Sequence, residues 1–222
     1  MPGSQPSREP LAGPTTRQPD PPPTGTARGY SIVIPPEWRK IPVRHGADKA
    51  VTEIVAEVFR SLPRDAPPDR VGPYRRQLHS QLTGMVREAR EKGGLDLYLP
   101  VLPMHGAPVG ASFIVSELSL GTADPAMVVA HLVAEDDAVL PVTVDEAVGL
   151  RIERAAGPAP GEGIEAGSRR VDYVLKVPGD PERWLVIAFS TLGGGDPDDD
   201  IARLLTGLFD AMMSTFRWQR EP

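Results

Sequence analysis

The stretch Ile201–Phe216, IARLLTGLFDAMMSTF, is the most regular part of the sequence and decides the fold class. Its large apolar residues recur every three or four positions: Ile201, Leu204, Leu205, Leu208, Phe209, Met212, Met213 and Phe216. This spacing gathers them on one face of an α-helix. We therefore expect a long C-terminal helix that lays this apolar face on a sheet.

Strands for that sheet are expected upstream, at about residues 148–156, 169–177 and 183–191. The middle segment alternates, with Val171, Tyr173 and Leu175 on one face and polar side chains such as Asp172 on the other. The turn sequence Pro178-Gly179-Asp180-Pro181 joins it to the next strand. This pattern predicts an antiparallel meander.

The first half of the chain supplies the other expected elements. A β-prone run at 30–34 and a short edge segment at 41–43 are followed by two amphipathic helices, one over Ala47–Ser61 and one from a proline-rich turn at 67–73 to Gly93-Gly94. A hairpin of 95–101 with 111–118 and a short helix at 124–134 come next. We expect a layered α+β fold with an antiparallel sheet of about six to seven strands packed by three to four helices.

Residues 1–28 differ from the rest of the chain. They contain eight prolines and three glycines, and Leu11 is their only large aliphatic residue beyond Met1. Such a segment buries too little apolar surface to offset the entropy of ordering it. The sequence therefore predicts a disordered tail over 1–28 and a single α+β domain over 29–222.

Composition narrows the classes of function. The formal charge is −6, from 24 basic and 30 acidic residues, so no overall positive field favours nucleic acid or an anionic membrane. The chain has no cysteine, and we find neither a signal-peptide pattern nor an apolar run long enough to span a membrane. We expect a cytoplasmic protein that binds neither nucleic acid nor membrane.

The two ends of the domain resemble Mog1/PsbP-like domains, a family with actinobacterial members. The similarity is carried by Tyr30–Trp38, YSIVIPPEW, and by Trp184–Ser190, WLVIAFS, followed by the final helix. The resemblance implies a sheet between helices and a protein that acts by binding partners, as a small-GTPase accessory factor or a photosystem accessory subunit does. No functional residue of the family maps here by motif.

No metal or cofactor motif is complete. The four histidines, His45, His79, His105 and His131, are scattered, and the helical pair His131 and Glu135 lacks a third ligand nearby. Asp196, Asp198 and Asp200 have the spacing that opens a calcium loop, but Ile201 and Gly207 replace the glycine and glutamate that such a loop requires. We assign these aspartates to the N-cap of the final helix and expect no cofactor and no metal.

Basic residues gather on the second helix, at Arg75, Arg76, Arg87, Arg90 and Lys92. Arg87 with Glu91 and Glu88 with Lys92 have the spacing of helical ion pairs, which favours a solvated surface. An anionic partner is the other interpretation.

The sequence thus predicts a non-enzymatic protein-interaction or accessory domain, with a protein partner whose identity it does not give. The alternative is a small-ligand-binding protein or hydrolase with a cleft near His45, His105 and the 193–196 loop. Two histidines and an aspartate in one concave pocket would favour the alternative, and an apolar patch would favour the interaction domain.

Overall fold

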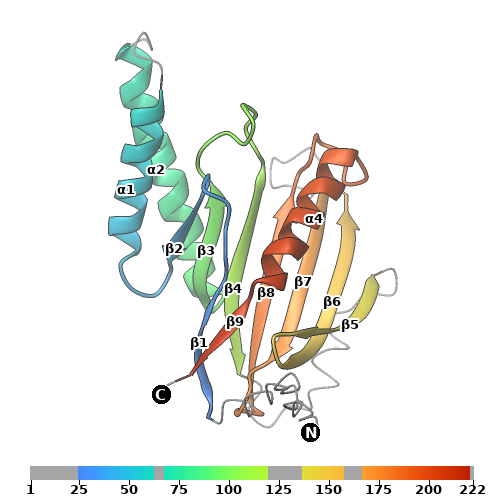
Figure 1. Cartoon of the computed structure of the whole chain (residues 1–222). Helices are drawn as coiled ribbons and strands as arrows, with labels where there is room; N and C mark the ends of the chain where they lie inside the picture. The colour runs from blue at the N-terminus through green and yellow to red at the C-terminus, as the bar shows by residue number, and fades with distance from the viewer. Residues whose placement is uncertain (1–24, 63–67, 120–136, 158–166, 221–222) are drawn as a thin grey trace, which may run out of the picture.

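The main sheet has seven antiparallel strands. The computed structural model describes residues 25–62, 68–119, 137–157 and 167–220 (Figure 1). The strands lie in the order β2 (Trp38–Pro42), β3 (Gly94–Pro100), β4 (Ala111–Ser119), β8 (Arg183–Thr191), β7 (Ser168–Lys176), β6 (Ala147–Ala156) and β5 (Ala138–Val144). The expected hairpin and meander are confirmed as β3–β4 and β6–β7–β8.

A separate two-stranded ribbon joins the two ends of the described chain. It consists of β1 (Ala27–Ser31) and β9 (Arg217–Arg220), which pair antiparallel. The prediction of a strand at 30–34 is wrong in its bounds, because β1 ends at Ser31. The expected domain start at residue 29 falls inside β1, where Ala27 is buried and donates its N–H to the Pro178 carbonyl at 3.0 Å.

Helices cover the sheet from both sides. The helices α1 (Ala47–Ser61) and α2 (Pro68–Glu91) lie together on one face at the β2–β3 end, and α4 (Asp200–Ser214) lies on the other face with the ribbon (Figure 1). Alternation along β4 shows the division, since Ile114 packs with the α1 and α2 cluster while Phe113 packs with α4. The α+β class is therefore confirmed, with three helices and two sheets in the described part of the chain.

The core beneath α4 is aromatic. Phe209 is fully buried, and its ring lies 4.7 Å from that of Phe189, 5.5 Å from Phe113 and 5.6 Å from Tyr173. These centroid separations lie in the range in which aromatic pairs attract. The long C-terminal helix is confirmed and packs on the sheet through this face.

The N-cap of α4 is Asp199 and not one of the three aspartates assigned to it from the sequence. Its side chain accepts hydrogen bonds from the backbone N–H groups of Ala202 and Gly194. These bonds stabilise the carboxylate, led by that from Ala202, and hold the pKa of Asp199 below its usual value. Asp198 instead accepts a hydrogen bond from Arg169 at 3.1 Å.

Other expectations differ in their bounds or lie outside the described residues. The α1 bounds are confirmed, but α2 begins at Pro68, within the stretch expected to be a turn. Two strands, β5 and β9, were not expected. The helix predicted at 124–134 and the tail over 1–24 fall outside the described residues. None of the described helices is long and apolar enough to cross a membrane.

Candidate functional site

The first candidate site is an apolar pocket where the β3–β4 loop meets the start of α4. We call it the apolar pocket; its volume is about 440 Å³. Its lining comes from the loop, from Gly193 and from one side of the helix: Met104, His105, Ala107, Pro108, Val109, Gly110, Gly193, Ile201, Leu204, Leu205 and Leu208. Among the described residues that line it, His105 is the only titratable one, so contact with an apolar group is the chemistry that they offer.

The loop that forms one wall of this pocket is held at both ends. Met104 and Ala107 exchange backbone hydrogen bonds of 2.9 and 3.0 Å across a turn in which His105 has a φ of 50°. The Trp38 indole N–H contacts the Met104 sulfur at 3.4 Å. At the other end the Thr191 hydroxyl donates to the Gly110 carbonyl at 2.9 Å. These contacts give the pocket a defined wall.

The opposite wall exposes part of the apolar stripe of α4. The prediction that all eight large residues cover the sheet is wrong for two of them, because Ile201 is 53% exposed and Leu204 is 72% exposed. Leu205 and Phe209 fill the contact with the sheet, while the first turn of α4 extends along the loop. The stripe is therefore wider than the surface that the sheet can cover.

The structure assembles only part of the cleft proposed as the alternative. His105 and Gly193 do line one pocket. His45 precedes Gly46, the N-cap of α1, and therefore lies on the other face of the sheet. Asp196 does not line the apolar pocket, and its side chain accepts the Asp198 N–H at 2.9 Å. The combination that would favour the alternative, two histidines and an aspartate, is not found among the described residues that line this pocket.

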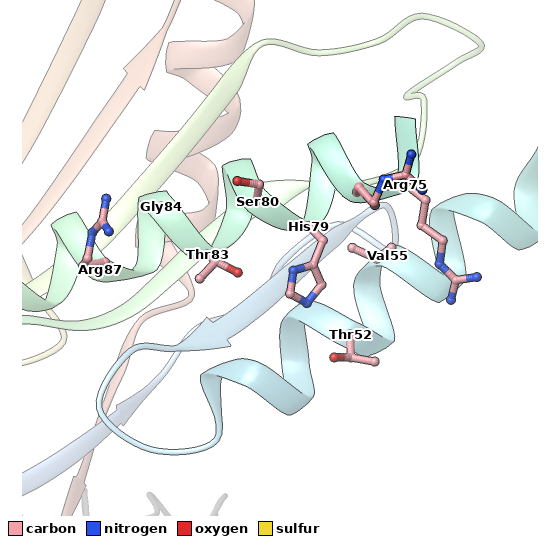
Figure 2. Close-up of a pocket in the computed structure, with 9 residues that line it drawn as sticks. Thr52, Val55, Arg75, His79, Ser80, Thr83, Gly84 and Arg87 are labelled. Atoms are coloured by element: carbon pink, nitrogen blue, oxygen red, sulfur yellow. The ribbon is translucent and has the colours of Figure 1, made fainter. Parts of the chain in front are cut away.

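The second candidate site is a groove between α1 and α2, which we call the basic groove. Its volume is about 590 Å³ (Figure 2). Two residues of α1 and seven of α2 line it: Thr52, Val55, Arg75, Arg76, His79, Ser80, Thr83, Gly84 and Arg87. The helices α1 and α2 cover the face of the sheet opposite to α4, so the groove lies on that side of the molecule. Its lining includes three of the five basic residues noted in the sequence, Arg75, Arg76 and Arg87.

The other two basic residues have structural contacts. Arg90 donates two hydrogen bonds to the Val43 carbonyl, of 3.0 and 2.7 Å, and so fastens α2 to the chain after β2. Lys92 pairs with Glu88 at 2.5 Å, as the spacing predicted. The predicted pair of Arg87 with Glu91 is not among the ion pairs of the described residues.

Sequence reasoning missed a polar cluster that links the ribbon to the main sheet. The Tyr30 hydroxyl donates to the buried Asp96 carboxylate and lies 3.1 Å from the Tyr98 hydroxyl, while the Lys40 ammonium lies 3.0 Å from Asp96. Burial raises the pKa of both tyrosines above the usual value. Both phenols therefore stay protonated near neutral pH, and we interpret the cluster as a structural link.

A second missed cluster joins α4 to the sheet. Arg151 donates two hydrogen bonds of 2.9 Å to Asp210, and the Tyr173 hydroxyl donates to the same carboxylate at 2.8 Å. Arg151 and Arg169 also bind Glu153. Alternation in the sequence gave no sign of these contacts, because the partners are far apart in the chain. Arg151 and Arg169 are each paired with a carboxylate of this chain, so we interpret this cluster as a structural link too.

No group of three or more histidine, aspartate or glutamate side chains in the described ranges is arranged to hold a metal ion.

Comparisons with known proteins assign the chain to no family. No protein-family profile and no curated protein matches it. Among solved structures, a crystal structure of a protein from Bacteroides thetaiotaomicron VPI-5482 is similar at 11% sequence identity, with a TM-score of 0.36. The similarity covers 59% of this chain and 40% of that one. This chain thus matches less than half of that protein's length.

Proposed function

We propose that the protein is a non-enzymatic interaction or accessory domain that binds a partner protein through the apolar pocket. The partner would insert an apolar side chain of leucine size between the β3–β4 loop and the first turns of α4. The exposure of Leu204 and Ile201 carries this proposal, because large aliphatic residues gathered beside a concave surface are typical of protein contacts.

The chemistry of the pocket supports binding over catalysis. A hydrolase needs a nucleophile or an activated water together with a base and a group that orients it. The lining residues that the structure describes supply one imidazole, no carboxylate and no hydroxyl. Contact with an apolar side chain requires none of these groups.

The resemblance to Mog1/PsbP-like domains points in the same direction. That family has a sheet between helices and acts by binding partners, and this chain has helices on both faces of its sheet. We extend the proposal to a Mog1/PsbP-like accessory role in the cytoplasm. The partner is then a protein of that compartment.

A second candidate function is the binding of a small apolar ligand in the same pocket. It is favoured by the anchored loop and by a volume within the range of small-molecule sites. An apolar ligand of this kind would contact Met104 and Leu208 in place of a partner side chain.

The variant Leu204→Asp tests the proposal. Leu204 is largely exposed, so the variant should keep the melting temperature while placing a charge at the mouth of the pocket. Leu204→Met retains an apolar surface, and Arg203→Glu changes the charge on an adjacent exposed position. Affinity capture from the native cells, followed by quantitative mass spectrometry, compares the three variants with the wild type.

We expect the wild type, Leu204→Met and Arg203→Glu all to capture the same partner protein. Leu204→Asp should fail to capture it. It is overturned if every captured protein is retained equally by Leu204→Asp. Native mass spectrometry of the purified protein tests the second candidate function. A small apolar ligand would copurify with the wild type and be absent from Leu204→Asp.

A further inference from the structure

The basic groove carries an inference that is independent of the apolar pocket. We propose that it binds an acidic peptide segment of a partner protein, with carboxylate or phosphate groups held at the two ends of the groove. The two sites lie on opposite faces of the sheet, so neither depends on the other.

The arrangement of residues along α2 gives the groove a basic row. Arg75, His79, Thr83 and Arg87 follow one another at intervals of four, as do Arg76, Ser80 and Gly84 in the neighbouring row. Residues four apart lie on the same side of a helix, so these two rows form one continuous strip. Figure 2 shows Arg75 near one end of this strip, Arg87 near the other, and His79 extending toward α1, where Thr52 lies.

The arginines of the groove are available to a ligand. Arg75, Arg76 and Arg87 are exposed, and within the described ranges none of them forms an ion pair. Arg39 and Arg151, by contrast, bind carboxylates of this chain. A guanidinium without a carboxylate presents its full set of donors to an anion from outside.

One contact fixes an arginine without using its donors. The Arg75 guanidinium lies 5.9 Å from the centroid of the Phe59 ring. Contact with the face of a ring leaves the N–H groups at the edge of the guanidinium free, and that edge is what binds carboxylate or phosphate in a bidentate manner. Phe59 thus positions Arg75 at the end of the groove.

The size of the groove selects an extended ligand. Twelve residues of helix separate Arg75 from Arg87, which corresponds to about 18 Å. An extended peptide rises about 3.4 Å per residue, so acidic groups about five residues apart would reach both ends. The hydroxyls of Ser80 and Thr83 can donate to the peptide carbonyls between them.

A peptide fits this groove better than other anions do. Among the described lining residues none is aromatic, and the rings of Phe59 and Tyr74 at one end contact each other, so no row of rings follows the groove on which the bases of a single-stranded nucleic acid would stack. A membrane surface is broad, whereas the arginines line a concave space between two helices. The formal charge of −6 over the whole chain also opposes binding to a long polyanion.

Gly84 allows the groove itself to be tested without a change in charge. A Cβ atom built at Gly84 has no atom within 4 Å, so a side chain can start there without strain, and because Gly84 lines the groove, that side chain occupies the space of the ligand. Replacing a glycine inside a helix also removes a destabilising residue. Gly84→Phe should therefore block the groove and leave the fold intact.

The experiment is a fluorescence anisotropy titration of the full chain at low salt. The probes are three labelled six-residue peptides with glycine and serine between their ends, carrying glutamate, phosphoserine or glutamine at both ends. We expect the two acidic peptides to bind and the glutamine peptide not to bind. Arg75→Glu and Arg87→Glu should each weaken binding by about tenfold or more, the usual effect of losing a charged hydrogen bond.

The controls distinguish specific binding in the groove from nonspecific electrostatic attraction. Arg203→Glu on α4 makes the same change in charge and should leave the affinity within about twofold, while Gly84→Phe should abolish binding. The proposal is overturned if Gly84→Phe binds like the wild type, if no acidic peptide binds, or if only an oligonucleotide or anionic vesicles bind. Leu204→Asp should bind the acidic peptides normally, so the two proposals can fail separately.

Discussion

The two faces of the main sheet are built differently. Beneath α4 the core is aromatic, with Phe209 at the centre of three ring contacts, and charged side chains fasten the helix to the strands through Asp210. Under α1 and α2 the buried residues are aliphatic, such as Val51 and Leu82, and the helices cover only the β2–β3 end. The α4 face therefore carries most of the specific packing.

This difference bears on the two binding sites that we propose. The charged residues of the cluster on the α4 side bind one another, and the first turn of α4 exposes the apolar side chains Ile201 and Leu204. The α1 and α2 layer keeps arginines that no carboxylate of the described chain binds. The α4 face thus exposes apolar side chains, and the α1 and α2 layer exposes guanidinium groups.

The largest expected effect is that of truncating the ring at the centre of the α4 face. Phe209→Ala should lower the free energy of unfolding by about 3 to 5 kcal/mol, because it removes a fully buried ring and leaves a cavity. Phe59→Ala on α1 makes the same chemical change at a half-buried position and should cost about 1 to 2 kcal/mol. Urea denaturation of both variants measures the difference, and equal losses would contradict the contrast between the faces.

A pair of N-terminal deletions gives a smaller effect on the same face. Deleting residues 1–24 should leave the melting temperature unchanged, since their composition predicts no packed structure. Deleting residues 1–28 also removes Ala27, which is buried and hydrogen-bonded to Pro178. We expect a loss of at least about 1 kcal/mol, or about 2 to 4 °C by calorimetry. Equal melting temperatures for the two deletions would show that the ribbon adds no stability.

The smallest effect concerns the dependence of stability on pH. Burial raises the pKa of the Glu153 carboxyl, but hydrogen bonds from Arg151 and Arg169 outweigh it and hold the pKa below the usual 4.5. Because the folded pKa is depressed, this contribution to stability is present above pH 4.5 and is lost as the pH falls through the folded pKa.

Glu153→Gln should therefore flatten the loss of stability between about pH 5 and 3. Glu53→Gln on α1 is the matched control, because that carboxylate is exposed and its ion pair with Lys49 is long, at 3.9 Å. Denaturation midpoints across this pH range are the measurement. If the control flattens the curve as much as Glu153→Gln does, the α4 face is not the origin of the acid sensitivity.

Periodicity predicted the elements whose residues face a single core. The helix Ala47–Ser61 was expected with its observed bounds, because Val51, Ile54 and Val55 mark one side of it. The strands β6, β7 and β8 were likewise expected to within about one residue, and β7 was expected from its alternation. Local sequence is sufficient where one face of an element is buried and the other is exposed.

The missed strands lack such a pattern. β5 contains Pro141 and lies at the edge of the sheet, where most of its residues are exposed, so it resembles a loop. β9 is the short segment RWQR, and only its pairing with β1 makes it a strand. Both depend on partners that are distant in the sequence, which local periodicity cannot identify.

The candidate sites were predicted in part for the same reason. Arg75, Arg76 and Arg87 were recognised as basic, but their groove exists only because α1 packs beside α2. His105 and the 193–196 loop were named together, whereas the separation of His45 follows from the division of the sheet into two faces. The exposure of Leu204 could not be read from a regular apolar stripe.

The pairing of β1 with β9 affects the order in which the contacts of the protein form during folding. Ala27 pairs with Arg220, so the ribbon closes a loop that contains nearly the whole described chain. Contacts of such long sequence separation are the slowest to form, because the entropic cost of closing a loop grows with its length. Among the described elements β1 is synthesised first and β9 last, so β1 must wait for its partner strand. The stacked rings of Tyr30 and Phe216, 5.4 Å apart, are then among the last contacts of the nascent protein to form.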